Sequence, residues 1–255
     1  MREKSRPVVT ADDPIDFGDE IIPASEKSGR VRAVFDSVAS SYDIMNDVMS
    51  LGIHRRWKDT LIRLISPTAD QHLIDLAGGT GDISARFLRA GGGSATIVDI
   101  NTEMMAAGRK RGDLSRLQHL SWVAGDAQAI PIADHTADIV TIAFGLRNVT
   151  DRDAAIAEAF RILKPGGRFF CLEFSRVRSR PLSSVYAMWS ALLPGMGQLI
   201  ANDSESYRYL VESIRRFPPQ EEISAKFAAA GFSRVKCRDL SYGIAAIHCG
   251  WKLEL

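Results

Sequence analysis

The segment LIDLAGGTGD (Leu73 to Asp82) joins a short apolar run to a glycine-rich turn and then to a helix that should begin at about Asp82. Glycines lack the Cβ atom that would keep a ligand away from the backbone, and the first N–H groups of a helix point toward whatever lies in front of it. This order of elements predicts a nucleotide site in an α/β fold. The segment leaves open which nucleotide is bound.

The dinucleotide fingerprint G-x-G-x-x-G is incomplete, because Gly79 and Gly81 supply its first two glycines but Ser84 stands at the third position. A second apolar run, residues 95–99, ends in Asp99. Its carboxylate comes roughly 20 residues after the turn, where an acidic side chain accepts hydrogen bonds from ribose hydroxyls. NAD and S-adenosylmethionine both carry that ribose, so Asp99 alone does not separate them.

Two further features favour S-adenosylmethionine. A third apolar run, His119 to Ala124, leads to Asp126 and Ala127, whose carboxylate and backbone N–H could contact the polar edge of adenine. A Pro-Gly-Gly turn at residues 165–167 closes a helix and precedes another apolar strand. Together with Asp75, just ahead of the glycines, these features resemble the class I S-adenosylmethionine-dependent methyltransferases. The alternative, an NAD-dependent oxidoreductase, would explain the glycines and the ribose contact but not the other features.

Four motifs in one order narrow this resemblance. They are VFDSVASSYDIMND (34–47), the glycine turn, FGLRNV (144–149) and SYRYLVESI (206–214). The set is similar to the ubiquinone/menaquinone biosynthesis C-methyltransferase family. The resemblance implies methyl transfer from S-adenosylmethionine to a ring carbon of a polyprenyl quinol, either demethylmenaquinol or a 2-methoxy-6-polyprenyl-1,4-benzoquinol. Another phenolic or lipid acceptor, or a non-catalytic donor-binding subunit of a quinone-biosynthesis complex, stays open as an alternative.

The same resemblance assigns the donor site by matching positions. Glycines and a threonine of the turn should line the methionine part of the donor, one aspartate the ribose, and an aspartate–alanine pair the adenine. In order along the chain, the predicted donor residues are Asp75, Gly78, Gly79, Thr80, Asp99, Asp126, Ala127 and Ala143. Ala143 is a departure, because the family usually has a serine there, so any hydroxyl contact at this point is absent or replaced.

Catalysis is expected where the fourth predicted strand ends, at Arg147 and Asn148, since ligands bind outside the carboxyl ends of parallel strands. Methylation of a ring carbon needs an electron-rich quinol and not the oxidised quinone. We hypothesise that Arg147 stabilises the developing phenolate while Asn148 and Tyr42 orient the ring hydroxyl. Because a guanidinium stays protonated, a water relay or a carboxylate such as Asp43 would accept the proton. The alternative is that Arg147 and Asn148 only begin a loop.

The resemblance implies a Rossmann-like class I methyltransferase fold in a single domain, residues 26–255. Its mostly parallel seven-stranded sheet would carry helices on both faces, with strands at residues 72–77, 95–99, 119–124, 137–144 and 168–174 and two more near the end of the chain. Around it we expect a helical cap (26–66), a donor-binding core (72–174), a helical insertion (181–216) and a C-terminal helix with strands (219–255). Residues 1–25 are predicted to be a disordered tail.

Composition agrees with a cytoplasmic enzyme. The 255 residues are 45% hydrophobic with a formal net charge of +1, which gives no sign of a nucleic-acid partner. Three cysteines without paired or metal-ligand spacing predict a reduced chain and no metal site. The most apolar segment, Val185 to Ile200, is broken by Pro194 and is too short to span a bilayer. It could line a tunnel for the substrate tail, contact the membrane surface or simply pack as a helix. His54 and His248, the other candidate bases, are not assigned to catalysis.

Overall fold

The centre of the molecule is a seven-stranded sheet with the strand order β5-β4-β3-β6-β7-β9-β8. The computed structural model describes residues 9–38, 47, 50, 52–179, 186, 188–193, 195 and 203–253. The first five strands of the order run parallel, and β9 is antiparallel to both β7 and β8. The strands are β3 (His72–Leu76), β4 (Ser94–Asp99), β5 (Leu120–Ala124), β6 (Ala137–Ala143), β7 (Leu163–Phe174), β8 (Ser233–Leu240) and β9 (Ala245–Trp251). The predicted α/β architecture is confirmed.

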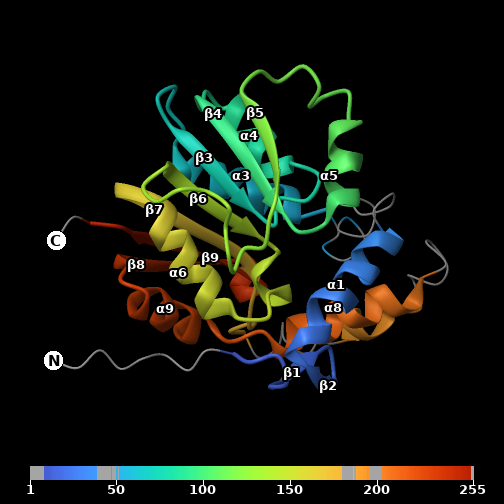
Figure 1. The fold of residues 1–255 in the computed structure, drawn as a ribbon. Coiled ribbons are helices and arrows are strands. Elements are labelled where there is room, and N and C mark those ends of the chain that lie inside the picture. The colour runs from blue at the N-terminus through green and yellow to red at the C-terminus, as the bar shows by residue number, and fades with distance from the viewer. Residues whose placement is uncertain are drawn as a thin grey trace, which may run out of the picture.

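Helices cover both faces of this sheet, as Figure 1 shows. The central strands are mostly apolar, as with Ile139, Val140 and Ile142 in β6, because a parallel sheet is buried on both sides. One apolar cluster packs α3 (His54–Ile65) and α4 (Asp82–Arg89) on the sheet, and the other packs α6 (Arg152–Ile162) and α9 (Gln220–Ala229). Helix α5 (Thr102–Arg109) follows β4 and contacts α1 (Ala24–Val38). Two short 3₁₀ turns, η1 (Leu146–Asn148) and η2 (Ser241–Gly243), complete the fold.

The prediction of a disordered tail over residues 1–25 is wrong for the described part of this segment, which forms a hairpin and the start of a helix. β1 (Pro14–Phe17) and β2 (Glu20–Pro23) form an antiparallel hairpin that leads into α1 (Ala24–Val38) and contacts α8 (Ser204–Arg216). The Phe17 ring stacks on Tyr209 at 4.4 Å between centroids, and the Asp19 carboxylate pairs with Arg215 and Arg216. Disorder was predicted from the terminal position, but these partners lie almost 200 residues away and local patterns do not reveal them.

Strand β7 begins earlier than predicted. The Pro-Gly-Gly turn was expected to separate a helix from a strand starting at Arg168, whereas Leu163 already pairs with Ala137 on β6. The register then shifts before Arg168 pairs with Ile139. Gly166, with φ of 81°, makes the local bend within the strand. The turn residues thus form an irregularity of β7 and not a loop between two elements.

Other boundaries agree more closely, and parts of the predicted cap and insertion are helical. Helices α1 and α3 fall in the cap, and α8 falls in the insertion, beside α1 at the lower right of Figure 1. Cap residues 39–46, 48, 49 and 51 and insertion residues 181–185, 187, 194 and 196–202 lie outside the described residues. No helix in the described part of the chain is long and apolar enough to cross a bilayer.

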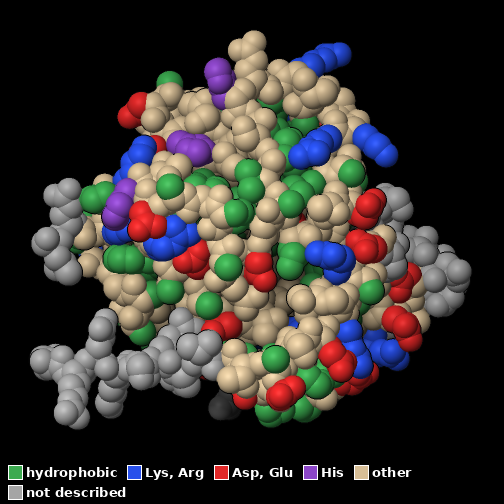
Figure 2. Space-filling model, viewed as in Figure 1, with side chains coloured by type: hydrophobic (Ala, Val, Ile, Leu, Met, Phe, Trp, Pro, Cys, Tyr) green, Lys and Arg blue, Asp and Glu red, His purple; other side chains and the backbone are tan. Residues whose placement is uncertain are grey.

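The surface carries both signs of charge. On the face drawn in Figure 2, basic and acidic side chains stand next to one another at several places. Ion pairs of the described residues include Arg161 with Glu158 and Arg89 with Asp113. This distribution matches the near-zero net charge of the chain.

Candidate active site

A cleft of about 800 Å³ opens at the carboxyl ends of the central strands. Helix α1 forms one wall with Ser28, Val31, Arg32 and Phe35, whose spacing puts them on one helical face. The opposite walls come from the loops after β3, β4, β5 and β6. Of the predicted residues, this cleft brings together Gly79, Asp99, Asp126, Ala127 and Asn148.

A smaller cavity of about 410 Å³ adjoins the cleft, and both are lined by Ala77, Gly79 and Phe144. Its walls hold the remaining predicted donor residues, Asp75, Gly78, Thr80 and Ala143. All eight predicted donor residues therefore line one of two connected spaces. Lys58 and Asp82 also line the smaller cavity, and they were not predicted.

The glycine turn has the conformation that its sequence suggests. Gly81 precedes α4 with φ of 83°, and a Cβ placed on it would lie 2.8 Å from Ile97 Cδ1. A Cβ on Gly78 would lie 2.9 Å from Ile97 Cγ2 and 3.1 Å from the Asp75 carboxylate. Ile97 of β4 and the Asp75 carboxylate therefore leave no room for a side chain at Gly81 and Gly78. Because glycine has no Cβ, the backbone of the turn can approach a ligand closely.

Asp75 stabilises the start of the glycine turn through hydrogen bonds of its carboxylate. Its carboxylate accepts hydrogen bonds from Thr141 Oγ1 at 2.7 Å and from Ser84 Oγ at 3.0 Å. Ser84 occupies the third position of the dinucleotide fingerprint, and its hydroxyl makes a hydrogen bond to Asp75 that a glycine could not make. Burial raises the pKa of Asp75 to about 6.

Asp99 connects β4 to the glycine turn. Its Oδ2 accepts a hydrogen bond from Gly79 N and its Oδ1 from Asn101 N, both at 2.7 Å. Burial raises its pKa, although both backbone donors favour the ionised form. Each oxygen keeps a lone pair for a further donor such as a ribose hydroxyl.

Asp126 forms a turn with Gln128. Its Oδ1 accepts from Gln128 N at 2.9 Å, and Gln128 Oε1 in turn accepts from Asp151 N at 2.7 Å. Asp151 also caps α6 by accepting from Ala154 N at 2.9 Å. The loops after β5 and β6 are therefore tied together beside the cleft.

The two predicted catalytic residues of η1 have different surroundings. Asn148 lines the cleft, and its Oδ1 accepts a hydrogen bond of 3.1 Å from Tyr209 Oη. Arg147 lines neither space. Its side chain is 2% exposed, and Nη1 donates to Glu173 Oε1 at 2.7 Å and to the Phe144 carbonyl at 2.5 Å. Direct contact between Arg147 and a phenolate stays a prediction, and Tyr42 lies outside the described residues.

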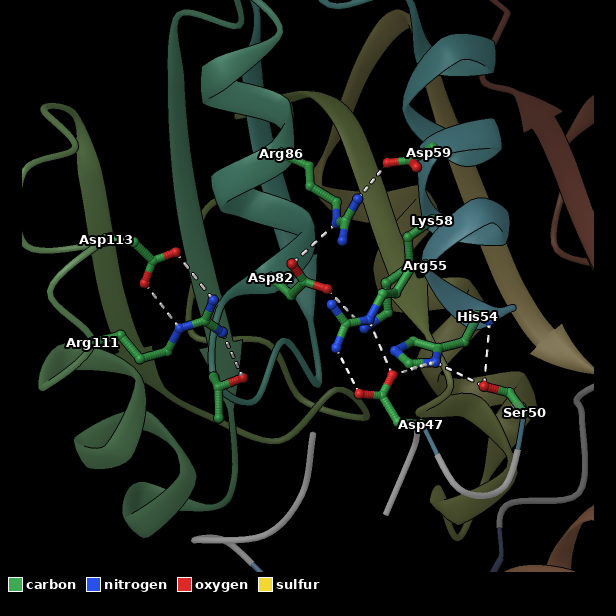
Figure 3. A network of polar contacts seen from close by, with 11 residues as sticks. Asp47, Ser50, His54, Arg55, Lys58, Asp59, Asp82, Arg86, Arg111 and Asp113 are labelled. Carbon is green, nitrogen blue, oxygen red and sulfur yellow. Dashed lines mark hydrogen bonds and ion pairs between the residues drawn. The ribbon is translucent and has the colours of Figure 1, made fainter. Parts of the chain in front are cut away.

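A charged network borders the smaller cavity, as Figure 3 shows. Lys58 Nζ donates to Asp82 Oδ2 at 2.8 Å, and Arg86 Nε donates to Asp82 Oδ1 at 3.0 Å. Burial alone would raise the pKa of Asp82, but the two cations lower it to about 2. Burial and the nearby Lys58 charge lower the pKa of His54 to about 4, so this imidazole is neutral at pH 7. His54 Nδ1 lies 2.8 Å from Ser50 Oγ.

The sequence analysis assigned no site role to Tyr209, Lys58 or Asp82. Tyr209 lies in the quoted SYRYLVESI motif, but no role followed from its position there. Lys58 falls on the buried stripe of α3 together with Trp57 and Leu61, and a lysine at an apolar position was the available signal. His248 has the structural role expected, because its Nε2 lies 3.0 Å from the Gln220 carbonyl oxygen inside the core.

The sequence as a whole is similar to known methyltransferases. Residues 24–252 match the model of the ubiE/COQ5 methyltransferase family. A ubiquinone/menaquinone biosynthesis C-methyltransferase UbiE from Ruegeria sp. is 52% identical over 99% of this chain and 100% of its own length. The protein of the same name from Acidiphilium cryptum is 52% identical over 96% of this chain and 99% of its own length.

Solved structures share the fold at much lower identity. A methyltransferase from Thermotoga maritima, described as a possible histamine N-methyltransferase, superposes with a TM-score of 0.63 at 19% identity, over 86% of this chain and 98% of its own. The YcgJ protein from Bacillus subtilis gives 0.58 at 16% identity, over 79% and 100%. These likenesses support the class I S-adenosylmethionine-dependent methyltransferase architecture.

Proposed function

The chain belongs to the ubiE/COQ5 methyltransferase family and is an S-adenosylmethionine-dependent C-methyltransferase of ubiquinone/menaquinone biosynthesis; from this premise we propose that the reduced quinol ring is methylated beside Asn148. The observation that carries the proposal is the cleft itself. It holds Asn148 together with four of the residues expected to bind the donor, Gly79, Asp99, Asp126 and Ala127, and the smaller cavity beside it is lined by the other four. A polyprenyl quinol, either a benzoquinol or a naphthoquinol, is the acceptor.

The donor spans both spaces in this proposal. The adenine contacts Asp126 and Ala127, the ribose hydroxyls donate to Asp99, and the methionine part enters the smaller cavity beside Gly78 and Thr80. The sulfonium then lies near Gly79 and Phe144, which border both spaces. Its methyl group consequently points toward the ring that Asn148 orients.

The reaction balances without any redox change. A phenolic proton of the quinol leaves, and electron density moves onto the ring carbon. That carbon forms a bond to the methyl group as the sulfur–methyl bond breaks, which gives S-adenosylhomocysteine. The ring carbon then loses its own proton and the phenolate oxygen takes up a proton, which restores the hydroquinol with one proton released overall. An oxidised quinone lacks the phenolic proton and should not react.

Arg147 lines neither space, so we assign it an indirect role in methyl transfer. Its contact with the Phe144 carbonyl and its pairing with Glu173 hold η1, and so Asn148, in place. Because Glu173 is only 1% exposed, the pair lies in a low-dielectric region where charges act strongly on their surroundings. Tyr42 completes the proposed acceptor contacts, and Asp43 or a water molecule takes the proton.

Methyl transfer from labelled S-adenosylmethionine to short-tailed benzoquinols and naphthoquinols tests this function. Carbon-methylated product is expected only in the presence of a chemical reductant. The matched control is the same quinone without reductant. Donor binding without transfer to either ring would refute the quinol acceptor.

We further propose that the enzyme works in the cytoplasm at the membrane surface, where tailed quinols reside. Met188 and Leu192 are 70% and 60% exposed, and their spacing in the helical residues 188–193 puts them on one face. Flotation with phospholipid vesicles should be lost on replacing both with serine. Ile21→Ser, at a 61% exposed site on the hairpin, is the control that should still float. Equal flotation of all variants would contradict this contact.

A further inference from the structure

The smaller cavity is lined by one lysine and two aspartates, Lys58, Asp82 and Asp75, and the Asp75 carboxylate is hydrogen-bonded to Thr141 and Ser84. Lys58 comes from α3 of the N-terminal cap, and Asp82 starts α4 directly after the glycine turn. We propose that Lys58 binds the α-carboxylate of the donor's methionine end and thereby selects donors that carry an amino acid end. The proposal rests on the function proposed above and adds to it a residue from outside the sheet.

The geometry favours a ligand of mixed charge. The methionine end carries an ammonium and a carboxylate on the same carbon, and Lys58 Nζ and Asp82 Oδ2 lie 2.8 Å apart in the cavity wall. A zwitterion placed against this pair would meet a charge of opposite sign at both of its groups. Phe144, Ala143 and Ile83, which also line the cavity, have apolar side chains.

Lys58 also has the capacity for a second partner. A lysine ammonium has three donors, and Asp82 accepts one of them. Asp82 is already paired with Arg86 at its other oxygen, so it remains compensated when Lys58 turns to a ligand. The Lys58 side chain is 8% exposed, and a buried cation gains strongly from a further anion.

Among the described residues, Lys58 is the cationic side chain that lines the cavity. His54 is neutral, because its pKa is lowered to about 4. Asp47 is held by Arg55 through two hydrogen bonds of 2.6 and 3.0 Å. Arg86 pairs with Asp59 and Asp82 and does not line the cavity. Figure 3 shows Lys58 and Asp82 approaching each other from their two helices.

A purely structural ion pair is the competing explanation, and ligand comparison separates the two. Three ligands are titrated by calorimetry: S-adenosylhomocysteine, decarboxylated S-adenosylmethionine, which keeps the amine, and 5′-methylthioadenosine, which lacks the amino acid end. In Lys58→Met, affinity for S-adenosylhomocysteine should fall by about 10- to 100-fold. Affinity for the other two should stay within about twofold of wild type, a change of under 1 kcal/mol.

Lys164→Met is the matched control, because it removes a lysine that also pairs with an aspartate, Asp138, but lines neither space. It should bind all three ligands as wild type does. Lys58→Arg should keep part of the preference for the carboxylate, and it replaces Lys58→Met if the latter does not fold. Equal weakening of all ligands, or unchanged binding of S-adenosylhomocysteine, would overturn the role of Lys58. Wild-type protein that binds none of the three would instead refute the proposed function.

Discussion

Tyr209 donates a hydrogen bond of 3.1 Å from its Oη to Asn148 Oδ1 and so connects α8 to the wall of the cleft. The tyrosine is 5% exposed and stacks on Phe17 of the N-terminal hairpin. Burial raises its pKa, so the hydroxyl stays protonated and can donate. The hairpin, α8 and the proposed acceptor contact thus form one chain of contacts.

Tyr209→Phe should lower kcat by about tenfold, because Asn148 loses the donor that fixes its amide. Affinity for the donor should not change, since Tyr209 lines neither cavity. Tyr207→Phe is the matched control: its hydroxyl is buried and has no hydrogen-bond partner among the described residues. Steady-state kinetics with calorimetry would check both, and equal effects of the two variants would refute the positioning role.

Arg147→Ala should abolish methyl transfer while leaving donor affinity intact, because the guanidinium supports η1 and not the donor site. It should also lower the free energy of unfolding by about 3–5 kcal/mol, since Glu173 is then left as an uncompensated buried charge. Urea unfolding measures this loss. If Arg147 stabilises the protein through its ion pair with Glu173, Glu173→Ala should lower the free energy of unfolding by a similar amount. The double variant should then lose less than the sum of the two single losses. Unchanged turnover in Arg147→Ala would remove this residue from the mechanism.

Features that depend on residues close in sequence could be predicted. Features that depend on the packing of elements distant in sequence could not. The glycine turn and the position of Asp99 at the end of β4 depend on neighbours within a few residues, so pattern and family motif were sufficient. Lys58 reaches the cavity only because α3 packs on α4, and Tyr209 reaches Asn148 only because α8 packs against the hairpin. The Pro-Gly-Gly turn was misplaced for the same reason, because pairing with β6 extends β7 across it.

Gly81→Ala should destabilise the protein and weaken donor binding at least about tenfold, because the new Cβ would meet Ile97 at the turn. Gly166→Ala is a matched control, with nearly the same φ (81° against 83°) and open space around its Cβ. Gly166→Ala should lower the free energy of unfolding by about 1–2 kcal/mol, the cost of a Cβ in the left-handed backbone region, and leave donor affinity unchanged. Urea unfolding and donor titration separate the two effects. Equal donor affinity in both variants would show that the close approach at Gly81 is not needed.

Stability should depend on pH through Asp75. Burial raises its pKa from 3.8 to about 6 in the folded state, so the folded protein binds more protons than the unfolded chain between these values. The free energy of unfolding should therefore decrease as pH rises from about 4 to 6 and level off above, by at most about 3 kcal/mol.

Asp75→Asn removes the titrating group and keeps an oxygen acceptor for Thr141 or Ser84. The difference in unfolding free energy between wild type and this variant, measured in urea at several pH values, isolates the contribution of Asp75 from that of other groups. Wild type should lose stability relative to the variant as pH rises through this window. A pH-independent difference would mean that Asp75 titrates in the folded protein as it does in the unfolded chain, with Thr141 and Ser84 offsetting the cost of burial.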